Sequence, residues 1–282
     1  MHRVTYISGA TGFAGSMLSD HLASQGEDLL VSASNEIKLQ ELADNLSKKY
    51  PNVKVKTFIC DLSIPEFWDK DISVFKNFYV ANYINCSGIQ GPIGSISQIS
   101  PHEMTRVFNV NLFSSIFFTN LFVRELQPDK KLSIVHFSGG GSTSPRPFFM
   151  PYSLSKTCLL RFVENFAAEN LNENIKINAI SPGVLPSRMQ EEIINTLGME
   201  KSKDFLVAEE SLLDKNISVT KLLELCDFLI SSKSHGITGK LISANWDNWK
   251  EWPAHVDELK SSDLYTLRRI TGRDRGHEWG DL

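Results

Sequence analysis

Two side chains that can move a proton lie four residues apart in the segment PYSLSK, residues 151–156. At this spacing Tyr152 and Lys156 share one face of a helix, because positions i and i+4 are neighbours on the helix surface. An unperturbed phenol has a pKa near 10 and is a poor acid or base at neutral pH. A neighbouring cation stabilises the phenolate and lowers that pKa. The pair therefore predicts a tyrosine that acts as a general acid/base.

A glycine-rich loop, SGATGFAG at residues 8–15, lies between a strand-like run and a helix-like run. Such a turn opens a helix whose backbone N–H groups and positive end can bind a pyrophosphate. We expect Gly9 to form the tight turn, Gly12 to let a phosphate approach, and Gly15 to let the helix pack closely. The spacing G-x-x-G-x-x-G differs from the G-x-G-x-x-G of the generic dinucleotide fold. By itself the loop also fits a tight connection that binds nothing.

The elements that must position these residues alternate along the chain. Strands are expected at 3–8, 28–33, 53–59, 79–85, 131–137, 175–180 and 237–243, and helices at 14–25, 36–49, 102–126, 152–171 and 218–232. This alternation is typical of βαβ units. We therefore expect an α/β fold: a doubly wound, Rossmann-type parallel sheet of about seven strands with helices on both faces. Ligands bind such sheets at the carboxyl ends of the strands.

No repeat, low-complexity tract or linker divides the chain, so residues 1–244 are expected to form a single domain. The amphipathic, charged segment 184–216 belongs to this domain and lies outside the sheet. Residues 245–282 form an extension rich in Trp and Arg, which we expect to pack on the domain or on a neighbouring subunit. The alternative for this extension is that one of its arginines reaches an anionic group of the substrate. These arginines are Arg268, Arg269, Arg273 and Arg275.

The composition excludes several classes of function. The 282 residues carry a formal net charge of -4, which gives no electrostatic reason to expect nucleic acid. No apolar run approaches the roughly 20 residues that span a bilayer, and no signal-peptide pattern is visible, so we expect a cytoplasmic protein without membrane contact. The four cysteines and seven histidines show no metal-ligand spacing, so no metal site is expected.

Several motifs in consistent order make the chain resemble the short-chain dehydrogenase/reductase family over nearly its whole length. YSLSK is similar to the family's YxxxK, which implies that Tyr152 is the catalytic acid/base and that Lys156 lowers its pKa and binds the nicotinamide ribose. Asn111, in NVNL, is similar to the asparagine that holds a water for proton relay. The family's serine, a hydrogen-bond donor to the substrate oxygen, would fall on Gly139. A loop longer by one residue brings Ser138 into register, and Ser142 is the alternative.

The resemblance also implies a bound nicotinamide dinucleotide in the domain 1–244. NCSG at 85–88 is similar to the segment that supports the adenine side, CDLS to the segment whose aspartate meets the adenine, and SPGVLPS at 181–187 to the turn beside the nicotinamide. The cofactor-binding residues expected on this basis are Gly9, Thr11, Gly12, Phe13, Gly15, Ser34, Asp61, Leu62, Asn85, Ser87, Gly88, Tyr152, Lys156, Pro182, Gly183 and Ser187.

The end of the second strand bears on the choice between NAD and NADP. An acidic side chain at this place binds the 2′-OH of NAD and repels a 2′-phosphate, and a basic one favours NADP. The sequence here is Ala33, Ser34 and Asn35, with neither an acid nor a base. The missing acid and the hydroxyl of Ser34 favour NADP, with NAD as the alternative.

These features predict an NAD(P)-dependent oxidoreductase that interconverts an alcohol and a ketone on a small polar substrate, such as a sugar or nucleotide sugar. The family resemblance implies a homodimer or homotetramer. Phe13 stands where the compact branch of the family has glycine, and the loop resembles that of the extended branch. This keeps open a nucleotide-sugar epimerase or dehydratase with tightly bound NAD. Gly139 at the serine position also keeps open a non-catalytic dinucleotide-binding regulator.

Overall fold

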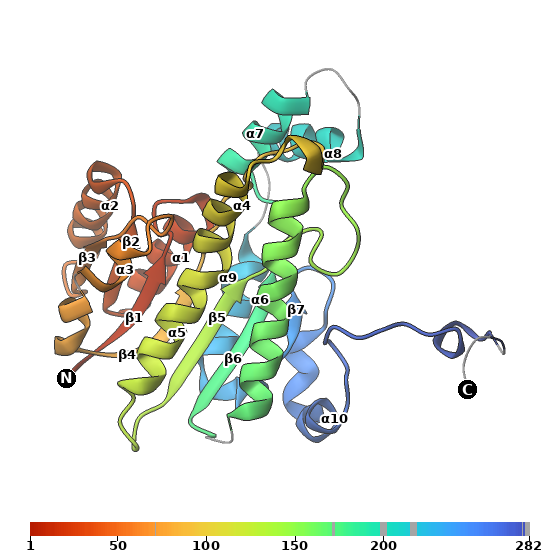
Figure 1. Cartoon of the computed structure of the whole chain (residues 1–282). Helices are drawn as coiled ribbons and strands as arrows, with labels where there is room; N and C mark the ends of the chain where they lie inside the picture. Colours follow the sequence, from red (N-terminus) through yellow and green to blue (C-terminus); the bar gives the residue numbers. More distant parts are fainter. Residues whose placement is uncertain (71, 171–172, 198–201, 215–218, 278, 280–282) are drawn as a thin grey trace.

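A computed structural model describes residues 1–70, 72–170, 173–197, 202–214, 219–277 and 279 (Figure 1). Within these ranges, seven parallel strands form one sheet in the order β3-β2-β1-β4-β5-β6-β7. The strands are β1 (His2–Ser8), β2 (Leu29–Ala33), β3 (Val55–Ile59), β4 (Phe78–Asn85), β5 (Leu132–Phe137), β6 (Ile175–Ser181) and β7 (Leu241–Ser243). The expected doubly wound parallel sheet is confirmed.

Helices cover both faces of the sheet (Figure 1). One face carries α1 (Phe13–Ser24), α2 (Glu36–Lys49) and α9 (Thr220–Ile230), whose apolar side chains form one core with the strands. The other face carries α3 (Glu66–Lys70), α4 (Pro101–Phe108), α5 (Ser114–Arg124) and α6 (Met150–Glu169). Apolar side chains of α3, α5 and α6 form the second core with the strands. Strands buried on both faces read as continuous apolar runs, and β4 and β5 are nearly all buried.

Two further helices, α7 (Arg188–Leu197) and α8 (Lys203–Leu213), lie above the carboxyl ends of the strands (Figure 1). They belong to the predicted segment 184–216, of which residues 198–201, 215 and 216 fall outside the described ranges. The remaining elements are α10 (Val256–Ser261) and short 3-10 turns at Ile72–Asn77, Ile96–Gln98, Ser232–Ser234, Trp249–His255 and Arg273–Arg275. Across the described ranges, no helix combines the length and apolar character that crossing a membrane requires.

Two expected elements differ from the observed ones. The expected helix 102–126 is interrupted at Asn109–Phe113 by a π-helical turn, labelled η3, which joins α4 to α5. The expected strand 237–243 contains regular β-structure only at its end, in β7. Gly239 takes a positive φ of 74°, so the chain turns there before it pairs with β6. The predicted helices 152–171 and 218–232 extend into residues outside the description.

The C-terminal extension first packs on the domain and then leaves it (Figure 1). Trp249 and Trp252 are buried in the first core, and Leu241 donates its backbone N–H to the carbonyl of Tyr265 over 2.9 Å beside β7. Trp246 and Trp279 are exposed in this single chain. The extension contacts the domain as far as Leu267, whose carbonyl accepts a hydrogen bond from Arg161 over 2.7 Å. Packing of the remainder on a neighbouring subunit stays a prediction.

Candidate active site

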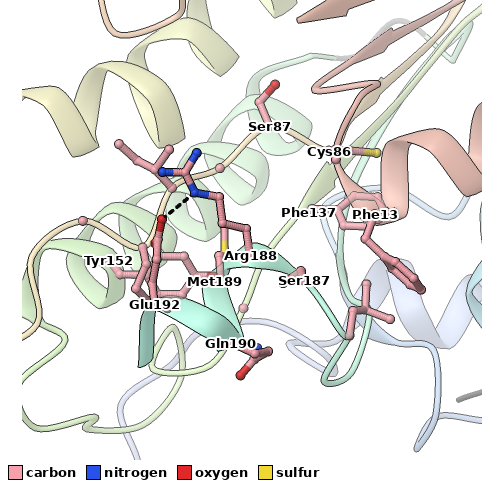
Figure 2. Close-up of a pocket in the computed structure, with 18 of the residues that line it drawn as sticks. Phe13, Cys86, Ser87, Phe137, Tyr152, Ser187, Arg188, Met189, Gln190 and Glu192 are labelled. Carbon is pink, nitrogen blue, oxygen red and sulfur yellow. Dashed lines mark hydrogen bonds and ion pairs between the residues drawn. The ribbon is translucent and has the colours of Figure 1, made fainter. Parts of the chain in front are cut away.

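A cleft of about 970 Å³ runs along the carboxyl edge of the sheet, between the loops that follow β1, β4, β5 and β6, with α7 above it. Figure 2 shows Tyr152, Phe13 and Ser87 around this space, with Ser187 and Met189 at the start of α7. Most of the predicted site residues line it: Thr11, Gly12, Phe13, Gly15, Ser34, Ser87, Gly88, Ser138, Tyr152, Lys156, Pro182, Gly183 and Ser187. Gly9, Asp61, Leu62, Asn85, Asn111 and Ser142 lie outside its lining.

The glycine loop is held together by approaches that a side chain would block. Gly9 has a φ of 70°, and a β-carbon there would lie 2.8 Å from the backbone nitrogen of Ser87. A β-carbon on Gly15 would collide with the carbonyl oxygen of Gly9. Gly12 begins α1, and no side chain caps this helix end. The first N–H groups of α1 therefore remain available to an anion in the cleft.

Two predicted cofactor residues at the end of β3 take part in local structure. The Oδ1 atom of Asp61 accepts hydrogen bonds from the backbone N–H (2.9 Å) and the hydroxyl (2.7 Å) of Ser63. Leu62 packs in the second core, and its carbonyl accepts a hydrogen bond from the indole of Trp68 over 3.2 Å. Contact of Asp61 and Leu62 with a cofactor stays a prediction.

The side chain of Asn85 lies outside the cleft lining and binds residues around it. Its Oδ1 atom accepts hydrogen bonds from the hydroxyl of Ser8 (2.7 Å) and the backbone N–H of Ser87 (3.1 Å), and its amide donates to the hydroxyl of Ser115 (2.7 Å). His136 lies in the same buried layer and contacts the hydroxyl of Thr119 over 3.2 Å. Burial lowers the pKa of His136 to about 3, so this ring is neutral at pH 7. These side chains hold the ends of β1, β4 and β5 together.

Asn111 connects three elements just outside the cleft lining. It lies in the π-helical turn η3, a feature often found at functional sites. Its Oδ1 atom accepts a hydrogen bond from the backbone N–H of Ile89 (2.9 Å), and its amide donates to the Ile89 carbonyl (3.0 Å) and to the hydroxyl of Ser155 on α6 (3.0 Å). Asn111 thus ties the loop after β4 to the helix that carries Tyr152 and Lys156.

Lys156 and Tyr152 are almost completely buried at the start of α6. The ammonium of Lys156 donates to the carbonyl of Phe137 over 2.7 Å, and it lies 5.9 Å from the centre of the Tyr152 ring. Burial lowers the pKa of Lys156 to about 8. Burial also raises the pKa of Tyr152, and the charge that opposes this effect comes from Arg146. The ammonium of Lys156, the cation that the family resemblance implies for this role, is directed to the Phe137 carbonyl, and its effect on the pKa of Tyr152 stays a prediction.

The loop after β5 places Ser138, and not Ser142, at the cleft. Ser138 lines the cleft, whereas Ser142 lies behind it and accepts a hydrogen bond from the Ser138 hydroxyl over 3.0 Å. Gly139 lies against the hydroxyl of Tyr152, and a β-carbon at this position would collide with that hydroxyl. A serine at position 139 would therefore not fit, which supports the register that uses Ser138.

The residues of the cleft fit a nicotinamide dinucleotide. The cradle of Gly9 and Gly15 and the uncapped start of α1 suit a pyrophosphate. The hydroxyl of Ser87 is buried beside this loop and has no hydrogen-bond partner among the described residues. Buried polar groups are almost always hydrogen-bonded, so this hydroxyl indicates a polar ligand in the cleft. No group of three or more potential metal ligands occurs in the described part of the chain.

A sequence profile described as short chain dehydrogenase matches residues 3–198. The chain belongs to the short-chain dehydrogenase/reductase family. It is therefore an NAD(P)-dependent dehydrogenase or reductase, and the family assignment made from YSLSK, NCSG and SPGVLPS is confirmed.

Relatives of this short-chain dehydrogenase/reductase match it along most of their length. An uncharacterized oxidoreductase of Bacillus subtilis, YmfI, is 26% identical over 246 residues, which are 87% of this chain and 98% of the relative. A diacetyl reductase of Staphylococcus epidermidis that forms (S)-acetoin is 25% identical over 264 residues, covering 86% of this chain and 96% of the relative. The crystal structure of levodione reductase has the same fold, with a TM-score of 0.74, 21% identity, and coverage of 89% of this chain and 98% of that one.

Three cleft residues of this family member were not singled out from the sequence. Lys38 lines the cleft with Ser34, one turn into α2, and its position three residues after the helix cap Asn35 was a readable signal. Arg146 pairs through Nε with Asp204 on α8 over 2.8 Å, and its guanidinium lies over a phenylalanine ring. Gln90 directly follows the NCSG segment and Ile89. No motif indicated Arg146 or Gln90, because contacts between residues far apart in the chain bring each of them to the cleft.

Proposed function

We propose that this enzyme interconverts an alcohol and a ketone on a small polar substrate, with Tyr152 as the acid/base. The observation that carries the proposal is the placement of the Tyr152 hydroxyl against Gly139, beside Ser138, on the wall of a cleft that fits a dinucleotide. The name of the diacetyl reductase relative supports a small oxygen-rich substrate. Sugars and nucleotide sugars remain within this class.

The proposed division of labour follows from the burial and hydrogen bonding of each side chain. The nicotinamide, when bound, supplies or accepts the hydride. Ser138 donates a hydrogen bond to the substrate oxygen as negative charge develops on it. Tyr152 is protonated at neutral pH, since burial raises its pKa, and it is ready to give a proton to that oxygen during reduction.

Lys156 and Asn111 support the proton transfer in this proposal. The Lys156 amine, whose pKa is about 8, changes its charge close to neutral pH and can therefore return a proton to the phenol side. Asn111 holds the loop after β4 and α6 in register through Ile89 and Ser155. Its role is to keep Tyr152 on α6 and the loop after β4 at a fixed separation.

We propose NADP as the preferred cofactor. Ser34 and Lys38 line the cleft at the start of α2, and the side chain of Asn35 accepts a hydrogen bond from the backbone N–H of Lys38 over 2.9 Å. Glu36, the acidic residue in the first turn of α2, is exposed and is not part of the cleft lining. The Ser34 hydroxyl and the Lys38 ammonium suit a 2′-phosphate. Ser34→Asp should raise the KM for NADPH at least tenfold and leave the KM for NADH nearly unchanged; equal changes would contradict the preference.

The test of the reaction is Tyr152→Phe. We expect kcat with NADPH and a reducible ketone to fall about 10²–10⁴-fold, the usual contribution of a positioned general acid. Cofactor affinity, measured by quenching of tryptophan fluorescence, should stay within a factor of two. Tyr265→Phe, the same change on the extension outside the cleft, is the matched control. Wild-type turnover by Tyr152→Phe would rule out the proposed mechanism.

The same assay decides between the proposed reaction and the two alternatives. An epimerase or dehydratase with tightly bound NAD, which the Phe13 loop favours, would show no net change of nicotinamide absorbance during turnover. A non-catalytic regulator would bind the dinucleotide and transfer no hydride to any carbonyl. We further propose a cytoplasmic homodimer or homotetramer, and the mass in solution measured by light scattering tests its order.

A further inference from the structure

Gln90 is a buried glutamine on the wall of the cleft whose hydrogen-bonding capacity is not used by the described protein. Its side chain is 2% exposed, and its Nε2 atom has no hydrogen-bond partner among the described residues. The residue nevertheless belongs to the lining of the same cleft as Tyr152. Leaving a buried amide unpaired costs free energy that folding alone does not recover. Such a group is expected where a ligand supplies the missing partner.

The backbone on both sides of Gln90 is held rigidly. The preceding residue, Ile89, is bound through both its N–H and its carbonyl to the side chain of Asn111. The following residue, Gly91, has a φ of 70°, and a β-carbon there would collide with Val107 on α4. These contacts fix the backbone from which the buried Gln90 side chain extends, which lowers the entropy lost when that side chain binds a ligand.

The same hydrogen bonds link Gln90 to the proposed acid. Ser155 accepts a hydrogen bond from the Asn111 amide over 3.0 Å and donates its own hydroxyl proton to the carbonyl of Tyr152 over 2.8 Å. The position of Gln90 relative to Tyr152 is therefore set by Asn111, which contacts the neighbours of both. A group on the substrate that Gln90 binds would be held at a defined distance from the atom that Tyr152 protonates.

We propose that Gln90 determines substrate specificity: its amide donates a hydrogen bond to a second oxygen of the substrate, close to the carbonyl that is reduced. This inference rests on the proposed function and narrows its substrate class. Vicinal dicarbonyls and α-hydroxy ketones carry such an oxygen, whereas simple ketones do not. A site with a buried hydrogen-bond donor rejects an analogue that lacks the acceptor, because the donor is then left unpaired.

The experiment compares two ketones of equal carbon number in wild type and in Gln90→Met, which keeps the length of the side chain and removes its amide. Initial rates with NADPH are measured for 2,3-butanedione and for 2-butanone. We expect kcat/KM for the diketone to fall at least tenfold in Gln90→Met, and kcat/KM for 2-butanone to change less than twofold. For each ketone, kcat/KM of the variant is divided by kcat/KM of wild type. This ratio cancels the higher intrinsic reactivity of the diketone.

Two further measurements separate recognition from a structural role. Gln98→Met alters an exposed glutamine outside the cleft lining, at the end of the turn Ile96–Gln98, and it should leave the ratio of the two substrates unchanged. The thermal midpoint of Gln90→Met should equal or exceed that of wild type, because a buried unpaired amide has been removed.

Each contrary result has a distinct meaning. Equal losses for both ketones, or none for either, would show that Gln90 serves only packing or a bound water, and would overturn the inference while the proposed reaction stands. A wild-type enzyme that reduces simple ketones but not 2,3-butanedione would also overturn it. If no carbonyl compound supported NADPH oxidation by the wild-type protein, the proposed function would be overturned, and this inference with it.

Discussion

Two loops at the same edge of the sheet build the site in opposite ways. The loop after β1, residues 9–15, is made of backbone: its glycines admit close approaches to Ser87 and within the loop itself, and no side chain caps the helix it opens. The loop after β5, residues 138–149, acts through side chains that face the cleft, among them Ser138 and Arg146. The first loop binds by shape, and the second presents chemical groups.

The two loops also differ in what they do to stability. In the glycine loop, the conformation that suits a pyrophosphate is also the one that packs well, so function and folding agree. Around the loop after β5, Phe148 has a positive φ of 69°, the hydroxyl of Ser153 is buried without a partner among the described residues, and Lys156 is buried. Each of these features is unfavourable for folding. The catalytic side of the cleft is therefore maintained against a cost that the rest of the fold offsets.

The largest effect is expected in the glycine loop, from Gly15→Ala. The added methyl group would collide with backbone atoms of Gly9 and Ala10, which cannot move without opening the loop. We expect a loss of stability on the order of 3 kcal/mol and no measurable NADPH binding, since overpacking here displaces the binding surface itself.

Gly26→Ala is the matched control for this prediction. Gly26 follows α1 with a φ of 84°, and a β-carbon there meets nothing within 4 Å. It should cost about 1 kcal/mol through backbone strain and leave NADPH affinity unchanged. If Gly15→Ala unfolded in urea at the wild-type midpoint and bound NADPH normally, the description of this loop as a steric cradle would be wrong.

An intermediate effect is expected in the loop after β5, from the pair Ser138→Ala and Ser142→Ala. Ser138 lines the cleft and Ser142 lies behind it. Loss of a hydrogen-bond donor to a developing oxyanion costs about 100-fold in kcat, so Ser138→Ala should show that loss. Ser142→Ala removes only an acceptor for Ser138 and should cost less than tenfold. The reverse order of the two kcat values would assign the catalytic role to Ser142.

The smallest effect concerns the stability cost of the buried lysine. The pKa of Lys156 is lowered from 10.5 to about 8 in the folded protein, so the folded state binds fewer protons than the unfolded state between these values. The stability of wild type should therefore rise as the pH increases from 8 to 10.5. At pH 7, Lys156→Met should be more stable than wild type by about 1–3 kcal/mol, and this gain should shrink by pH 10.

Urea unfolding at pH 7 and pH 10 measures this difference. Lys54→Met, on the exposed segment before β3, provides the control, since an exposed lysine carries no burial cost. A Lys156→Met protein that is less stable than wild type at both pH values would show that the hydrogen bond to the Phe137 carbonyl outweighs the burial of the charge.

The sequence predicted the sheet well because buried parallel strands leave a strong local signal. The expected strands 3–8 and 79–85 agree with β1 and β4 within one residue at each end. The π-helical turn at Asn111 gave no such signal, since the helical period continues through it. The hydrogen-bond partner of the Asn111 side chain, Ile89, lies 22 residues away in the chain. The shortened β7 likewise depends on the turn at Gly239.

Part of the site could be predicted from spacing alone, namely the glycine loop and the pair Tyr152 and Lys156, because their partners are close in the chain. The preference for Ser138 over Ser142 required the tertiary structure, because only Ser138 lines the cleft. Arg146, which no motif indicated, lies where its charge opposes the raised pKa of Tyr152. Electrostatic effects of this kind depend on burial and on direction, which spacing does not contain.

The sequence by itself determined the fold class, the family and the two motifs at the carboxyl edge, because hydrophobic period and glycine spacing are local properties. Only the tertiary structure decided which side chains face the cleft, which hydrogen bonds hold Asn111 to Ile89 and Ser155, and which polar groups, such as Gln90, remain unpaired there. These outcomes arise where several strand ends and helices meet, and the free energy of each buried polar group depends on all of its neighbours at once.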